Sequence, residues 1–327
     1  MAGRLRIHFG VADVARLRVA SGPDVLWETA NSMHMLQTRR GAVLFDGWRQ
    51  ESRRRLGAPA RMLITLNPAI GSFPDFLTPT TGLSDFEAGL DLMLSTPRAR
   101  LRIELGELTV PARMRQWVRA VADTEPGAIR ELGRLYRAYH RTAVLPAWST
   151  VVAEVSAERQ RLAQAYLRGG SEAVLTQLAG PGGWRPPVLE LPYPWDRDLF
   201  LDGRGLVVLP SYFCWKHPCT LLDPELPPVL VYPLRLRHPV PFGAGRAHGD
   251  EPLGAMIGPT RAAVLRALEV PYSTSDLARR AGTSVPSASQ HATVLRRAGL
   301  ITTERKQGTA VHSLTPLGAA MLASQTP

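Results

Sequence analysis

Three side chains that can bind a metal or react as nucleophiles occur within six residues, in the segment CWKHPC. Cys214, His217 and Cys219 supply two thiols and an imidazole, which are common ligands of Zn²⁺. Structural zinc sites usually combine two well-spaced pairs of ligands, so we expect no metal and no cofactor here. Two alternatives stay open, namely ordinary buried or half-exposed thiols and a metal- or redox-responsive use of Cys214 and Cys219.

A second set of side chains has the chemistry needed to contact the edges of DNA bases. Between Val285 and Ala298, the residues Ala288, Ala292 and Leu295 follow one another at helical spacing and predict a buried stripe. The opposite face, which includes Gln290, begins with short, uncharged polar side chains. Small donors and acceptors near a helix N-terminus are what a helix needs to enter the major groove and contact bases.

The preceding residues predict a first helix and a tight turn that would position this second helix. Ser273 and Asp276 have the spacing of a capping box, which predicts a helix start. Gly282 suits the end of that helix, because the following turn needs a positive φ. Ser284 is the expected N-cap of the second helix, and Pro286 lies in its first turn, where the missing N–H costs nothing.

A two-stranded hairpin is expected after the second helix. The ranges 301–305 and 310–314 alternate between apolar and polar residues, and a turn is expected at 307–308. Arg305 and Lys306, beside the tip, could contact phosphates, which would give affinity without sequence information.

In these residues the chain resembles the winged helix-turn-helix regulators of the ArsR type, most clearly in SASQHATVLRRAGLI and SLTPLG. The resemblance covers about the last 70 residues. Two residues differ from the family's usual pattern: Ala292 stands where a leucine is common, and Thr309 stands where an arginine is common. The family's metal-sensing members carry cysteines on the helix that begins here at Ser273, and this chain has none there. The resemblance implies that the DNA-contacting residues are Ser284, Val285, Ser287, Ser289, Gln290, His291, Arg305, Lys306 and Thr309. For His291, a structural role at the edge of the helix is the alternative.

The same resemblance implies a partner and an assembly. We expect the chain to bind double-stranded DNA at a palindromic operator as a homodimer, because one helix per subunit reads only a short site. Repression by promoter occupancy is expected by analogy alone. The alternative is that this domain serves protein contacts only.

Composition limits the class of protein. At 327 residues the chain is long enough for two or three domains. The chain has no run of 18 uncharged apolar residues that would predict a membrane span, and its N-terminus has no long apolar segment, so we expect a cytoplasmic protein. The family resemblance implies that it is a bacterial regulator associated with the nucleoid. Net charge is +11, of which residues 258–327 carry +5. The positive charge is therefore densest where the DNA-binding motif lies.

The fold class expected is mainly α with small β elements. We expect a helical N-terminal region over 1–241, with a small β-rich part at about 184–241, for dimerisation and effector binding. A linker at 242–253 and a winged helix-turn-helix domain at 254–327 follow. Within the β-rich part, Asp196 and Asp198 are expected in a loop as solvated charges.

Aromatic side chains are concentrated in the β-rich part, where they either cover the sheet or line a pocket for a small apolar or aromatic effector. The sequence shows no nucleophile elbow, phosphate-binding loop or dinucleotide-binding motif, so we expect a regulator and not an enzyme. An enzyme or ligand-binding protein whose winged helix is a scaffold is the alternative. The candidate pocket residues are Trp184, Trp195, Tyr212, Phe213 and Trp215.

Overall fold

The computed structural model divides the chain into two compact units, residues 1–243 and 244–327. It describes residues 3–57, 62–68, 73–79, 83–180, 183–236, 240, 252–268, 271–306 and 309–323. Of these described residues, 56% are helical and 15% lie in strands, so the expectation of a mainly α chain with small β elements is confirmed. Among the described residues, no helix is both long and apolar enough to cross a membrane.

The helical part of the first unit surrounds one buried helix, α2 (Val25–Gln37). Asp24 caps it, and its Oδ1 accepts hydrogen bonds from the N–H groups of Leu26 and Trp27 at 3.0 Å each. Most of its residues are buried, including the charged Glu28. The hydrophobic core that contains α2 includes residues of α3 (Ala42–Arg55), α5 (Phe86–Leu94), α6 (Arg98–Gly106), α7 (Arg115–Ala122) and α8 (Pro126–Tyr139). Short 3-10 turns lie at Asp75–Leu77, Ala112–Met114 and Leu145–Ala147, and a π-helical turn follows α8 at His140–Val144.

Two small sheets complete this unit, and both include strands from the N-terminus. In the first sheet, of order β3-β4-β1-β5, β1 (Gly3–His8) lies between β4 (Val188–Tyr193) and β5 (Arg197–Phe200). It is antiparallel to β4 and parallel to β5. The outer strand is β3 (Trp184–Arg185), and the second sheet has the parallel order β2-β6-β7, from β2 (Arg18–Val19), β6 (Val207–Ser211) and β7 (Val229–Pro233). The β-rich part is therefore not confined to about 184–241, because strand pairing joins segments far apart in the sequence.

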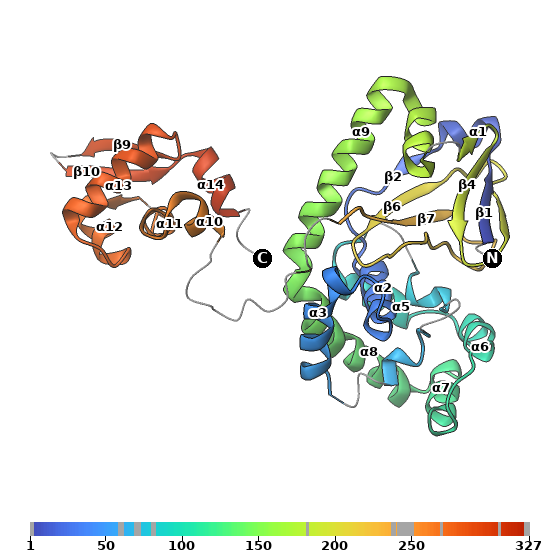
Figure 1. The fold of residues 1–327 in the computed structure, drawn as a ribbon. Coiled ribbons are helices and arrows are strands. Elements are labelled where there is room, and N and C mark those ends of the chain that lie inside the picture. Colours follow the sequence, from blue (N-terminus) through green and yellow to red (C-terminus); the bar gives the residue numbers. More distant parts are fainter. Residues whose placement is uncertain are drawn as a thin grey trace. The chain divides into compact units, whose positions relative to one another are not determined.

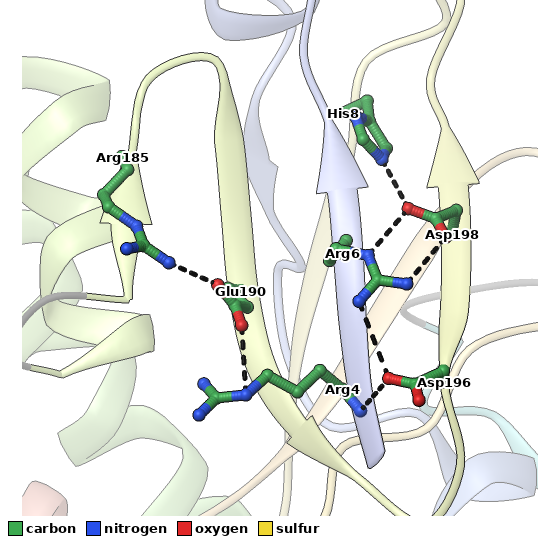
Figure 2. Close-up of polar contacts among 7 residues, drawn as sticks. All are labelled: Arg4, Arg6, His8, Arg185, Glu190, Asp196 and Asp198. Atoms are coloured by element: carbon green, nitrogen blue, oxygen red, sulfur yellow. Dashed lines mark hydrogen bonds and ion pairs between the residues drawn. The ribbon is translucent and has the colours of Figure 1, made fainter.

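One face of the first sheet carries a ladder of ion pairs (Figure 2). Arg6 on β1 pairs with Asp198 on β5 through two hydrogen bonds of 3.0 Å, and the Nε2 atom of His8 lies 2.7 Å from the same carboxylate. The Arg4 N–H donates to Asp196, which also pairs with Arg6. The loop expectation for Asp196 and Asp198 was wrong for Asp198, because β5 pairs in parallel with β1 and places its carboxylate opposite Arg6.

The helix α9 (Trp148–Ala179) connects the helical core with the core under the first sheet, as Figure 1 shows. Val151 and Val155 pack in the helical core, whereas Leu162 and Leu175 pack with the strands. Its dihedral angles are non-helical at Gly169 and Gly170. The helix resumes beyond this glycine pair because its second part also has an apolar face to bury.

The second unit has its own core. Its helices are α10 (Pro252–Ile257), α11 (Pro259–Arg266), α12 (Thr274–Arg280), α13 (Val285–Arg297) and α14 (Pro316–Ala323). Its sheet has the order β8-β10-β9, from β8 (Tyr272–Ser273), β9 (Ile301–Lys306) and β10 (Thr309–Leu314). Of the expected linker at 242–253, only Pro252 and Leu253 lie within the described residues, and they begin α10.

Candidate nucleic-acid interface

The helix α12 begins at the N-cap that the sequence predicted. The hydroxyl of Ser273 accepts the Asp276 N–H at 3.2 Å and donates to the Asp276 carboxylate at 2.7 Å. The hydroxyl, with help from Arg279 and Arg280, lowers the pKa of Asp276. The carboxylate therefore binds the capping hydroxyl and the guanidinium of Arg279.

The turn between α12 and α13 also follows from local sequence. Gly282 has a φ of +62°, in the region that favours glycine. Ser284 then caps α13, its hydroxyl accepting the Ser287 N–H at 3.3 Å. Pro286 occupies the first turn of α13, where no intrahelical N–H is needed.

The orientation of α13 is set by a narrow buried stripe. Ala288, Ala292 and Leu295 are at most 2% exposed, and the last two belong to the core of this unit. Because the stripe is confined to one side, the opposite side of α13 is available to solvent.

The predicted DNA-contacting residues of α13 divide into two groups. Ser284, Val285, Ser289 and Gln290 are exposed, and Ser287 and His291 are half-buried. The exposed group lies at the N-terminal end of the helix, as a helix that inserts into a major groove requires.

Two arginines of α13 were not among the predicted site residues. Arg296 and Arg297 are exposed in the last turn of the helix. Their positive charge and their place at the end of the second helix could have identified them from the sequence, because basic side chains at the end of such a helix can bind phosphates.

The hairpin after α13 is formed by β9 and β10, which pair with Arg305 opposite Ala310. Arg305 is exposed. The side chains of Lys306 and Thr309 and the turn at 307–308 lie outside the described part of the structure. Of the three predicted hairpin contacts, the structure therefore places the side chain of Arg305.

A buried histidine that the sequence analysis did not single out attaches this hairpin to α12. His312 on β10 is 5% exposed. Its Nε2 atom lies 3.0 Å from the Thr274 hydroxyl and its Nδ1 atom 2.9 Å from the Thr303 hydroxyl. Burial, and to a lesser extent Arg296, lowers its pKa. A neutral imidazole offers one donor and one acceptor, so it can bind both hydroxyls and fix β9 relative to α12.

The five predicted pocket residues of the first unit do not form one cluster. Trp195, Phe213 and Trp215 line a pocket of about 120 Å³. Tyr212 is buried in the helical core, and Trp184 packs edge-on against Phe9 with ring centroids 5.4 Å apart. Tyr212 and Trp184 thus cover the cores, which was the alternative role considered for the aromatic set.

The same pocket contains the residues of the CWKHPC segment. Cys214, His217 and Cys219 all line it, together with Asn31 and Arg40. Within the described ranges, however, no group of three or more His, Cys, Asp or Glu residues is arranged to hold a metal ion.

Comparison with known proteins identifies one region. Residues 257–304 match a family described as a helix-turn-helix domain. No curated protein and no solved structure matches the chain. The matched range contains α11, α12 and α13, so the chain carries a C-terminal helix-turn-helix domain, a module typical of DNA-binding transcription regulators.

Proposed function

We propose that this protein is a sequence-specific DNA-binding transcription regulator of the ArsR type. One observation carries the proposal: the N-terminal end of α13 exposes Ser289 and Gln290 while Ala288 and Leu295 anchor the helix from behind. In this proposal α13 enters the major groove, where a glutamine amide can bind adenine through two hydrogen bonds. Arg305, on the hairpin, binds a phosphate outside the groove.

The proposed active form is a homodimer on a palindromic operator. A single helix contacts only a few base pairs, and each correct pair contributes roughly 1–3 kcal/mol of discrimination. Two copies related by a two-fold axis double the site and increase its specificity. The proposal includes repression by promoter occupancy in a bacterial cytoplasm.

The proposal assigns signal reception to the first unit. The pocket lined by Trp195, Phe213 and Trp215 combines aromatic walls with the polar side chains of Asn31 and Arg40. Such a combination suits a small aromatic effector that carries a polar group. To regulate binding, the effector must have unequal affinity for the DNA-bound and DNA-free forms.

The test is selection of bound duplexes from a random-sequence DNA pool by the purified full-length chain, followed by binding titrations at several salt concentrations. The proposal predicts an enriched palindromic sequence and an affinity that falls as salt rises. A Ser289→Ala/Gln290→Ala double variant, whose side chains are exposed, is the matched control and should lose the enrichment while remaining folded. Failure of the wild-type chain to bind any duplex at low ionic strength would refute the proposal.

A further inference from the structure

The two cysteines of this 327-residue chain lie side by side in the first unit. The Sγ atoms of Cys214 and Cys219 are 4.0 Å apart. A disulfide requires about 2 Å between the sulfurs and about 3.8 Å between the Cβ atoms. Rotation of the two side chains toward each other can shorten a 4.0 Å separation, so the pair is close enough to be considered for oxidation.

The backbone on the Cys219 side is fixed to the second sheet. Cys219 donates its N–H to the Val231 carbonyl at 2.8 Å and accepts the Val231 N–H at 2.9 Å. Val231 belongs to β7. Cys219 is therefore held at a defined position beside the strand.

The backbone on the Cys214 side is fixed to α2. The buried carboxylate of Glu28 accepts the N–H groups of Tyr212 and Phe213 at 2.7 and 3.0 Å. The Ser211 hydroxyl accepts the Cys214 N–H at 3.2 Å. With both ends of the segment anchored, the two sulfurs stay close together without a large loss of chain entropy on bond formation.

The two thiols differ in their access to solvent and in their acidity. Cys214 is buried, whereas Cys219 is partly exposed, and both line the pocket of about 120 Å³. The hydrogen bond from Cys214 lowers the pKa of Cys219, and the same contact together with burial raises the pKa of Cys214. The thiolate is the reactive form, so Cys219 is the thiol that a small oxidant meets first.

We propose that Cys214 and Cys219 are a site of reversible thiol oxidation by a small peroxide. The Cys219 thiolate attacks one peroxide oxygen, an S–O bond forms, the O–O bond breaks, and the leaving oxygen departs as hydroxide and is protonated to water. The resulting sulfenic acid is the first oxidised state.

The second step forms the disulfide. The Cys214 sulfur loses its proton and attacks the Cys219 sulfur, so an S–S bond forms, the S–O bond breaks, and the oxygen leaves as a second water. The two thiols together lose two electrons and two protons, and hydrogen peroxide is reduced to two molecules of water. A dithiol reductant reverses the change by thiol–disulfide exchange.

The sequence allows a direct test in the full-length protein. Trypsin cleaves after Arg204, Lys216 and Arg235, so Cys214 and Cys219 fall on separate peptides, 205–216 and 217–235. We expect hydrogen peroxide, followed by alkylation of remaining thiols, to produce these two peptides as one disulfide-linked species in mass spectrometry. Reduction should separate the species and restore both thiols to alkylation.

Two variants complete the test. In Cys214→Ser, the sulfenic acid at Cys219 should persist and be trapped by a dimedone probe, because no second thiol can displace it. In Cys219→Ser, the buried Cys214 should stay reduced at the same peroxide dose. The wild-type result does not depend on the folding of either variant.

Three outcomes would overturn the proposal. In the first, both wild-type cysteines are still alkylated after peroxide treatment. In the second, Cys219 is oxidised to the sulfinic acid while Cys214 remains free. In the third, the linked species is found only between two copies of the chain, which mixing of isotopically labelled and unlabelled protein would reveal.

Discussion

Gly318, in α14, approaches the carbonyl oxygen of Leu300 so closely that a Cβ atom added at Gly318 would lie 2.0 Å from that oxygen. The same carbonyl accepts the Thr315 N–H at 3.1 Å, and the Thr315 hydroxyl accepts the Gly318 N–H at 3.0 Å. The first turn of α14 therefore packs directly on the backbone of Leu300, which follows the end of α13. A glycine is required at this position for lack of space.

The first prediction follows from this contact. Gly318→Ala should lower the free energy of unfolding of the second unit by about 1–3 kcal/mol, because the backbone must move to admit the methyl group. Urea denaturation followed by circular dichroism measures the change. Gly47→Ala, on α3 with nothing within 4 Å of its added Cβ, is the control and should not destabilise the chain. Equal stability of Gly318→Ala and wild type would contradict the close contact.

The second prediction concerns the pH dependence of the second unit. Burial keeps the folded-state pKa of His312 below its ordinary value of 6.5. The imidazole of His312 therefore binds a proton more readily in the unfolded chain than in the folded one. The stabilisation that neutral His312 provides above pH 6.5 is lost as the pH falls through the folded-state pKa.

Urea denaturation at a series of pH values should show this loss in the wild type and a smaller one in His312→Gln. The half-buried His291 is the matched control, and His291→Gln should keep the wild-type profile. If His312→Gln and wild type respond identically to acid, the interpretation of His312 as a buried neutral group is wrong.

Local signals predicted the second unit well, and the reason is physical. Ser273, Gly282 and Ser284 start and end helices through contacts with residues three or four positions away. The alternation of apolar and polar residues predicted β9 and β10 for the same reason, because antiparallel strands that are adjacent in the sequence need only a short turn between them. The same helical spacing accounts for the exposure of Ser284, Val285, Ser289 and Gln290.

The first unit was less predictable because its sheets form by distant pairing. No local pattern indicates that β1 pairs with β5, about 190 residues further along the chain. The pocket likewise draws Asn31 and Arg40 from one region and Trp215 from another. His312 was missed because its role depends on Thr274 and Thr303, which reach it only in the folded sheet.

The third prediction concerns the buried carboxylate of Glu28. Burial is the main cause that raises its pKa to about 7, against the lowering effect of hydrogen bonds from Phe213, Tyr212 and Ser211. A raised folded-state pKa means that the contribution of Glu28 to stability is complete below its ordinary value of 4.5 and decreases as the pH rises through about 7.

For the wild type we expect a loss of at most about 1.4 kcal/mol per pH unit from this group over that range. Glu28→Gln cannot ionise, so its free energy of unfolding should show a flatter profile in urea denaturation from pH 5 to about pH 8. Glu107→Gln, at an exposed position, should reproduce the wild-type slope. If the slope in Glu28→Gln is unchanged or steeper, Glu28 is not the origin of the wild-type pH dependence.

The fourth prediction rests on the exposure of Arg305 on the hairpin. Arg305→Gln should weaken binding to all duplexes by a similar factor, because a phosphate contact carries no sequence information. It should also reduce the slope of log K against log salt by about 1. Binding titrations at several salt concentrations, with operator and scrambled duplexes in parallel, measure both effects. Loss of preference for the operator would show that Arg305 contacts bases.

The fifth prediction separates base contacts from phosphate contacts. Gln290, like its neighbour Ser289, is exposed on α13, and its amide can both donate and accept hydrogen bonds. Gln290→Ala should cost about 1–3 kcal/mol on the preferred operator and relax the preference at one base pair in each half-site, with the salt slope unchanged. Selection from a randomised operator pool detects the relaxed position. Val294→Ala, at an exposed position one turn further along α13, is the matched control and should leave that position unchanged. If Gln290→Ala instead weakens operator and scrambled duplexes alike, the proposed insertion of α13 into the groove is wrong.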